Sequence, residues 1–197
     1  MQTLIAATSP TMAPSETITA ALDWAADFDA VVHLYWPKVF RFALVSLRDR
    51  TAAETIAQDC FTRAWQARDR FRGDSSISTW LMQIAVNLIR DHARSRKLHF
   101  WRMLGSTSVD VSSAADLLAD GKTSPEMTAS AREQLAAVWN ATASLPEMQK
   151  TVFVLRFVED MDLLEIAEAT GLREGTVKTH LFRALQSVRK KMTGVGK

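Results

Sequence analysis

Apolar side chains recur at helical spacing along the first half of the chain. Residues 28–47 and 52–68 carry them three and four positions apart, and residues 77–96 repeat the pattern after the polar segment 71–76. Pro37, inside the first stretch, can kink that helix or divide it. The pattern therefore predicts three or four amphipathic helices in this half.

The second half shows the same periodicity in shorter stretches. Ser124-Pro125-Glu126 combines an N-cap, a first-position proline and a first-turn acid, so a helix is expected from there to about Ser144. Further helices are expected over residues 147–158, from Leu163 to Ala169, and after the turn Thr170-Gly171-Leu172.

Short polar motifs predict where two of these helices begin. Thr51 followed by Glu54, and Asp162 followed by Glu165, have the spacing of a capping box, in which two side chains bond free backbone N–H groups of the first turn. Gly171 stands where a helix end favours a left-handed residue. We therefore expect helix starts near these motifs and a turn at Gly171.

The helical pattern is lost in two places. Residues 8–19 are rich in Ser, Thr, Pro and Ala, and residues 105–123 are rich in Ser, Thr, Asp and Gly. We expect an all-α protein of two small helical domains joined by a flexible linker. The expected divisions are a disordered N-terminal extension at 1–24, a first domain at 25–99, a linker at 100–124 and a second domain at 125–197.

Composition agrees with this class and charge adds a pattern to it. Hydrophobic residues make up 47% of the chain, with only 7 Gly and 5 Pro. The net charge is +2, but residues 28–99 carry 12 Lys and Arg against 7 Asp and Glu, whereas residues 100–130 carry 2 against 4. Acids also cluster just before Gly171 and bases follow it, which makes the last helix a candidate phosphate-facing surface.

Several classes of protein are not favoured. Cys60 is the single cysteine and lies on an apolar stripe, so a buried thiol is expected, and the four histidines show no metal-ligand spacing. No clustered carboxylates or nucleophile with its base are visible, so we expect no enzyme, no metal and no cofactor. The N-terminus lacks a basic start, and no stretch is long enough to span a bilayer, so a cytoplasmic protein without membrane insertion is expected.

Residues 162–188 have helix-turn-helix spacing. The last helix has a narrow apolar stripe, formed by Val177, Leu181, Ala184, Leu185 and Val188. Its opposite face combines cations with side chains that can touch base edges, namely Lys178, Thr179, Phe182, Arg183 and Gln186. An ordinary helical hairpin with a solvated charged face is the alternative, and the aromatic Phe182 on the polar side argues against it.

A second polar edge lies on the helix 77–96, where two amides and two guanidiniums align as Gln83, Asn87, Arg90 and Arg94. Amides can read bases and arginines can hold phosphates, while the preceding segment 71–76 can hold an unstacked base. This arrangement suits single-stranded DNA. A capped surface helix with a charged end is the alternative.

Two long segments resemble extracytoplasmic-function sigma factors of bacterial RNA polymerase. Residues 28–97 resemble their region 2, through Phe71-Arg72-Gly73-Asp74-Ser75-Ser76-Ile77-Ser78-Thr79-Trp80-Leu81 and Ile84-Ala85-Val86-Asn87. Residues 135–191 resemble their region 4, through Leu145-Pro146, Val154-Leu155-Arg156-Phe157, Glu165-Ile166-Ala167-Glu168 and Gly175-Thr176-Val177-Lys178-Thr179-His180-Leu181-Phe182-Arg183-Ala184. Both segments stand in the family's order.

The resemblance implies a sigma factor whose partners are core RNA polymerase, promoter DNA in duplex and single-stranded form, and an anti-sigma factor. It implies contact with the polymerase clamp helices through Gln58, Asp59, Thr62 and Arg63. It implies that the minus-ten element is opened and read by Phe71, Arg72, Asp74, Ser75, Ser76, Trp80, Gln83, Asn87, Arg90 and Arg94. It implies that the minus-thirty-five element is bound by Arg173, Thr176, Lys178, Thr179, Phe182 and Arg183, with the core of region 4 on the polymerase flap.

Two features depart from the family pattern. Arg173 stands where the family often has Ser or another capping residue. The second feature is an aromatic run, Phe100-Trp101-Arg102-Met103-Leu104. Three interpretations of it are open: it extends the preceding helix, it packs between the domains, or it contacts a regulator. The rival interpretation of the whole chain is a helix-turn-helix transcriptional regulator that acts without binding the polymerase core.

Overall fold

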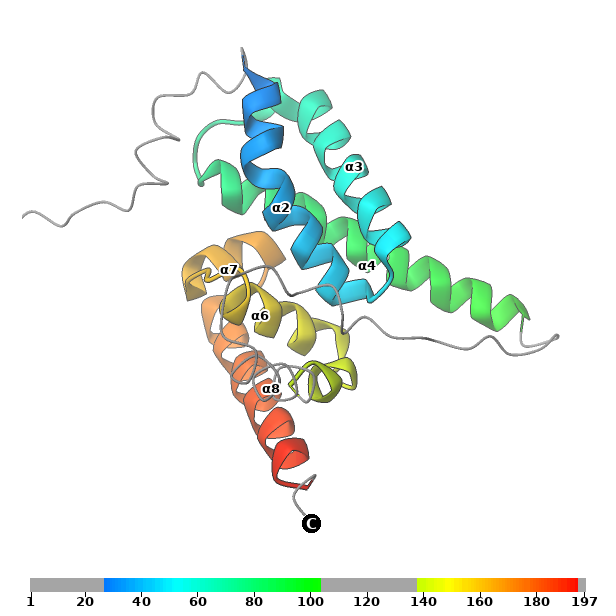
Figure 1. Ribbon diagram of the computed structural model, residues 1–197. Coiled ribbons are helices and arrows are strands. Elements are labelled where there is room, and N and C mark those ends of the chain that lie inside the picture. The colour runs from blue at the N-terminus through cyan, green and yellow to red at the C-terminus, as the bar shows by residue number, and fades with distance from the viewer. Residues whose placement is uncertain (1–26, 104–137, 195–197) are drawn as a thin grey trace, which may run out of the picture.

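The computed structural model describes residues 27–103 and 138–194, and all regular structure in these two ranges is helical (Figure 1). The labelled elements are α2 (Phe28–Leu47), α3 (Arg50–Ala67), the 3-10 turn η1 (Arg68–Arg70), α4 (Ile77–Met103), α6 (Glu147–Phe157), α7 (Leu163–Thr170) and α8 (Glu174–Gly194). Residues 138–143 are also helical. The expected all-α class with two small helical domains is confirmed, while the expected extension at 1–24 and most of the expected linker lie outside the described residues.

The first domain is a bundle of α2, α3 and α4, packed through the apolar stripes that the periodicity predicts (Figure 1). Phe42 from α2, Ala57 and Cys60 from α3, and Leu81 from α4 are fully buried together. The Cys60 thiol donates to the carbonyl of Leu81 at 3.4 Å, and burial raises its pKa to about 12. The expectation of a buried thiol is confirmed.

Pro37 neither ends nor divides α2, which runs as one helix past it. A proline inside a helix leaves the carbonyl four residues earlier without its backbone donor. Here both Pro37 and His33 lie on the exposed side of α2, where water can bond that carbonyl. The proline is therefore tolerated on the solvent face of the helix.

The predicted capping box at the start of α3 is wrong. The N-cap is Asp49, whose carboxylate accepts the backbone N–H of Ala52 at 3.0 Å, so Thr51 already lies inside the helix. Glu54 pairs instead with Arg50, one turn earlier, at 2.9 Å. An aspartate caps at least as well as a threonine, and Asp49 stands two positions earlier.

Helix α4 is longer than the periodicity predicts, because it continues from residue 96 to Met103. No glycine or proline interrupts the sequence until Gly105, so nothing in it stops the helix. Of the three interpretations of the aromatic run, the backbone supports the extension of the preceding helix.

The second domain is formed by residues 138–143 with α6, α7 and α8 (Figure 1). One face of α8 supplies Ala184 and Val188 to a small cluster with Leu145 and Phe153. At the other end of α8, Val177 is fully buried within the larger cluster that includes Ile166 of α7. The predicted apolar stripe of the last helix is thus buried as expected, with Leu181 and Leu185 half-buried.

The two domains are in contact. Helix α6 packs on α2, and α7 packs on α4, so that Val154, Met161 and Ile166 join the same hydrophobic cluster as the first domain. No helix within the described ranges is long and apolar enough to cross a membrane.

Candidate nucleic-acid interfaces

Helix α8 is positioned by a fully bonded start of α7 and a tight turn after it. The Asp162 carboxylate accepts the backbone N–H groups of Leu164 and Glu165, each at 2.8 Å, and the Glu165 carboxylate accepts the N–H of Asp162 at 2.8 Å. The predicted capping box is confirmed. Gly171 ends α7 with a φ of 69°, a left-handed conformation that suits glycine, and this places α8 as the second helix of a helix-turn-helix.

Helix α8 begins at Glu174, directly after Arg173. The carbonyl of Arg173 accepts the N–H groups of Thr176 and Val177 at 2.8 and 3.1 Å, which starts the helical bonding. Glu174 lies in the first turn, where its charge favours the positive end of the helix dipole, and it also pairs with Lys178 at 2.6 Å.

The face of α8 opposite its buried stripe is exposed along its length. Phe182 is 61% exposed, although an aromatic side chain gains free energy from burial. The residues predicted to bind duplex DNA are all exposed, and they are Arg173, Thr176, Lys178, Thr179, Phe182 and Arg183. The helix therefore presents cations and one aromatic ring together to solvent.

The predicted edge of α4 is only partly open. Gln83, Asn87 and Arg94 are exposed. Arg90 is half-buried, because its guanidinium donates to the carbonyl of Thr170 at 3.4 Å and approaches the sulfur of Met148 at 3.7 Å, both in the second domain.

The segment before α4 is ordered by its own contacts. Ser76 caps α4, since its hydroxyl oxygen accepts the N–H of Thr79 at 3.0 Å. Phe71 packs against Trp80 with ring centroids 5.1 Å apart, so both rings are half-buried. Arg72 and Asp74 are exposed on either side of Gly73, whose φ is 76°, and Ser75 is half-buried.

The predicted polymerase-facing row on α3 lies on one exposed side of the helix. Its members are Gln58, Asp59, Thr62 and Arg63. The Thr62 hydroxyl donates to the carbonyl of Gln58 at 2.9 Å, within the helix. Asp59 and Arg63 are exposed, so this side of α3 presents one acid and one base to a partner.

An ion pair joins the two domains, and no motif in the sequence predicts that its two members meet. The guanidinium of Arg41 on α2 donates to both carboxylate oxygens of Glu159, at 3.0 and 2.6 Å. The Glu159 side chain is fully buried. Burial raises the pKa of Glu159, while the hydrogen bonds and charge of Arg41 act in the opposite direction.

Two further cations cross the boundary between the domains in opposite directions. Arg48, just after α2, donates to the carbonyl of Trp139, and Lys150 on α6 donates to the carbonyl of Ser46. Burial, assisted by the nearby charge of Arg48, lowers the pKa of Lys150 to about 8. Each cation is thus held by the backbone of the other domain.

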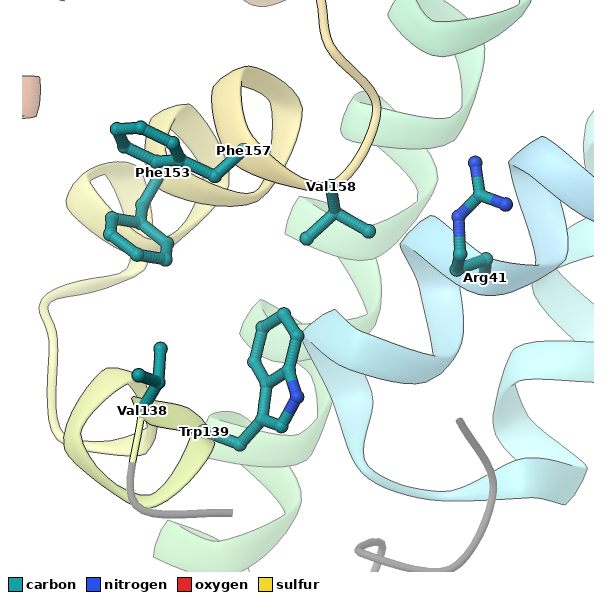
Figure 2. A pocket seen from close by; sticks show the side chains of 6 residues that line it. All are labelled: Arg41, Val138, Trp139, Phe153, Phe157 and Val158. Carbon is teal, nitrogen blue, oxygen red and sulfur yellow. The ribbon is translucent and has the colours of Figure 1, made fainter. Parts of the chain in front are cut away.

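A hollow of about 570 Å³ opens beside these contacts. Figure 2 shows Phe153 and Phe157 on α6 and Trp139 facing it, with Arg41 at its far side. The two phenylalanine rings are 4.8 Å apart, and Phe157 is 53% exposed. The remaining lining residues are Val138 and Val158. The hollow is therefore largely apolar with one cation at its edge.

Two small helical domains, of which the second is a helix-turn-helix with an exposed basic recognition helix, define a two-domain DNA-binding protein. Residues 31–99 match the family model of sigma-70 region 2, and residues 135–188 match that of sigma-70 region 4. These matches cover both domains in the family's order.

Curated relatives agree with these matches. The chain is 31% identical to the ECF RNA polymerase sigma factor SigW of Bacillus subtilis, over 84% of this chain and 88% of that protein. It is 30% identical to the RNA polymerase sigma-H factor of Pseudomonas aeruginosa, over 83% and 84% of the two chains. It is also 30% identical to the ECF RNA polymerase sigma-E factor of Escherichia coli K12, over 70% and 72%.

Solved structures show the same fold. A co-crystal structure of the sigma factor RpoE with the anti-sigma factor NepR from Bartonella quintana matches with a TM-score of 0.68 and 21% identity, over 85% of this chain and 97% of that one. A structure of CnrH with the cytosolic domain of CnrY matches with a TM-score of 0.61 and 20% identity, over 91% and 95%.

The chain belongs to the ECF group of RNA polymerase sigma factors. It is an alternative sigma factor, and sigma factors are in general transcription initiation factors and not enzymes. A regulator that acts without the polymerase needs only the helix-turn-helix, so the region 2 match does not favour that alternative.

Proposed function

We propose that this sigma factor binds core RNA polymerase and directs it to promoters by dividing the work among three exposed helical faces. The observation that carries the proposal is that α3, α4 and α8 each bury an apolar stripe and expose a polar one. On α3 the exposed row around Asp59 and Arg63 would contact the clamp helices of the polymerase.

The minus-ten element is assigned to α4 and the segment before it. Asn87 and Gln83 have free approach from solvent and can donate to and accept from base edges, and Arg94 can hold a phosphate. The Phe71 and Trp80 pair gives an apolar platform on which an unstacked base can lie. That base would be flanked by the exposed residues Arg72, Asp74 and Ser76 and by the half-buried Ser75.

The minus-thirty-five element is assigned to α8. A helix in the major groove needs its polar face free and its opposite face anchored, and α8 has both. Arg183 and Lys178 can hold phosphates or a guanine, while Thr179 and the ring of Phe182 can meet base edges and thymine methyl groups. The apolar hollow in Figure 2 would receive the polymerase flap.

We also propose that the two domains span residues 25–99 and 125–197, and that the protein is cytoplasmic and has no catalytic activity.

We further propose that an anti-sigma factor controls the protein. The support for this partner is that the RpoE structure of similar fold is a complex with an anti-sigma factor. Exposed apolar side chains on both domains, such as Leu34 and Leu164, offer surfaces for such a partner.

Transcription with purified components tests the proposal. The protein and core polymerase are incubated with a promoter library, and the transcripts that depend on the protein are mapped. Transcript starts that share upstream elements are expected, whereas no transcript from any promoter would contradict the proposal. Asn87→Ala should impair promoter opening and leave core binding unchanged, and Asp59→Ala with Arg63→Ala should weaken core binding. Equal loss of core binding in the Asn87 variant would refute the division between α3 and α4.

A further inference from the structure

The end of α3 carries an exposed stack of a cation on an aromatic ring. The guanidinium carbon of Arg68 lies 3.9 Å from the centroid of the Trp65 ring. Trp65 is 45% exposed, and it is supported by Phe28 of α2, with the ring centroids 5.2 Å apart. Neither Trp65 nor Arg68 belongs to the faces assigned to the polymerase or to the minus-ten element.

We propose that this stack is a second subsite for single-stranded DNA, in which a base just downstream of the minus-ten element lies on the outer side of the Arg68 guanidinium. The inference rests on the proposed role of the segment 71–76 in holding a minus-ten base. It adds a further contact with the same strand, outside that segment and outside α4.

The guanidinium of Arg68 is held in place by its own neighbours. Its Nη1 donates to the carbonyl of Trp65 at 2.9 Å, and its Nε lies 3.8 Å from the carboxylate of Asp69. The side chain is nevertheless 29% exposed. Unpaired bases stack on guanidinium planes as they do on aromatic rings, and a side chain that is already fixed loses little freedom on binding. The stack is therefore suited to a planar ligand.

One tight turn joins this stack to the segment that is proposed to hold the minus-ten base. The N–H of Phe71 donates to the carbonyl of Arg68 at 3.2 Å, which closes η1. A 3-10 turn rises about 6 Å over three residues, a length on the order of one or two nucleotides of a strand. A strand with one base on the Phe71 and Trp80 platform can thus reach Arg68 with the bases that follow.

The charge of this surface fits the phosphates of such a strand. Residues 68–72 hold three arginines and one aspartate, Asp69, which already contacts Arg68. Arg70 and Arg72 are exposed, so they can hold the phosphates that flank a stacked base.

The rival ligand is the polymerase, because Trp65 lies one turn beyond Thr62 of the polymerase-facing row on α3. That row presents one acid and one base, Asp59 and Arg63, whereas the surface around Arg68 is net positive. Charge therefore favours a nucleic acid over the polymerase as the ligand of the stack.

The need for an unpaired base decides which flank of the minus-ten element the subsite takes. A base that is still paired cannot stack on a side chain. Upstream, the promoter continues as a duplex toward the element assigned to α8, whereas downstream the strands must open to expose the start site. The bases that reach Arg68 are therefore those directly downstream of the minus-ten element.

Binding of abasic oligonucleotides to the holoenzyme tests the subsite. The probes are labelled single strands of a promoter mapped in the transcription experiment, and each contains the minus-ten element and the three nucleotides downstream of it. In each abasic probe one of these three nucleotides lacks its base. With the unchanged protein, loss of one of the three bases should weaken binding about tenfold, as is typical for a base that stacks on a side chain.

Arg68→Lys is the diagnostic variant, because it keeps the charge and removes the guanidinium plane. It should bind the intact probe about tenfold less tightly, and removal of the downstream base should then cause no further loss. Arg50→Lys is the matched control, since Arg50 lies at the other end of α3 with its guanidinium carbon 5.7 Å from the centroid of the Phe40 ring. The control should keep the full abasic penalty. Affinity for core polymerase, measured for each variant, should stay unchanged and shows that the variant is folded.

An abasic penalty of the same size in Arg68→Lys and in the unchanged protein would overturn the inference, as would the absence of a penalty at all three positions in the unchanged protein. Loss of core binding in Arg68→Lys would also overturn it and assign the stack to the polymerase. In these cases the minus-ten element itself is still bound. Failure of the proposed function would show differently, because the holoenzyme would then bind none of the probes, and the inference would fall with it.

Discussion

Arg41 on α2 binds both carboxylate oxygens of Glu159 across 118 residues of sequence, and the two side chains belong to different domains. The carboxylate is fully buried, whereas the arginine side chain is 42% exposed. The pair therefore couples the stability of the two domains through one contact, in which solvent reaches the arginine but not the carboxylate.

Arg41→Met should lower the free energy of unfolding by about 2 to 3 kcal/mol, somewhat less than is usual for breaking a fully buried pair, because water reaches part of the site. Urea denaturation measures the change. The double variant Arg41→Met with Glu159→Met should recover most of the loss, since no buried charge then remains unpaired. Additive losses in the double variant would show that the two side chains do not interact.

Lys150 should make stability depend on pH in the alkaline range. Its pKa is about 8 in the folded protein and 10.5 without burial, so the folded state favours the neutral amine. The stability from this group is fully present above pH 10.5 and is lost as the pH falls to about 8. In the unchanged protein the free energy of unfolding should therefore rise by about 1 to 2 kcal/mol between pH 8 and 10, and Lys150→Met should remove this rise. The figure follows from about 1.36 kcal/mol per pKa unit, reduced because solvent partly reaches the amine.

The measurement for Lys150 is the difference in the free energy of unfolding between the variant and the unchanged protein across this pH range. Taking the difference removes the opposite contribution of Cys60, whose raised pKa makes the folded state less stable as the thiol ionises in alkali. A difference that does not vary with pH would contradict the role of Lys150 burial.

The capping box at the start of α7 contributes to the stability of the second domain. Asp162→Ala removes the acceptor of two backbone N–H groups and should destabilise the second domain by about 1 to 2 kcal/mol. Thermal unfolding measures the loss. Asp160→Asn removes a neighbouring charge that is almost fully exposed and keeps a residue type that tolerates the left-handed backbone there (φ 52°), so it should change the unfolding temperature little. Equal effects from both variants would mean that charge, and not capping, is what matters here.

Local signals in the sequence were sufficient for the helices and for some of their ends. The apolar period placed α2, α3, α4, α6 and α8, and the Asp162 capping box was recognised because its members lie three residues apart. The same motif misplaced the start of α3, where Asp49 offered an equally good cap two residues earlier. Competing caps of similar strength cannot be ranked from local sequence alone.

The contacts between the domains could not be predicted in the same way. Arg41 and Glu159 each look like an ordinary solvated charge in their own segment, and Arg90 looks like a free member of a polar edge. Only packing brings them together. The charge distribution holds a partial signal, since the first domain is basic and acids cluster before Gly171. It predicts that the two domains attract each other, but not which side chains pair.

Arg183 and Phe182 separate two ways in which α8 can recognise duplex DNA. Arg183→Ala should weaken binding of a minus-thirty-five duplex by about 1 to 3 kcal/mol if the guanidinium contacts a base in bidentate fashion, and should relax the preference at that base pair. If Arg183 holds only a phosphate, binding should weaken equally for all sequences and depend less on salt.

Phe182→Ala should not alter the salt dependence, because the ring carries no charge, but should reduce discrimination at a thymine. Titrations of the polymerase holoenzyme on matched and mutated duplexes at several salt concentrations distinguish these results, and Glu168→Gln serves as the control. Binding that neither substitution changes would remove this face of α8 from the DNA interface.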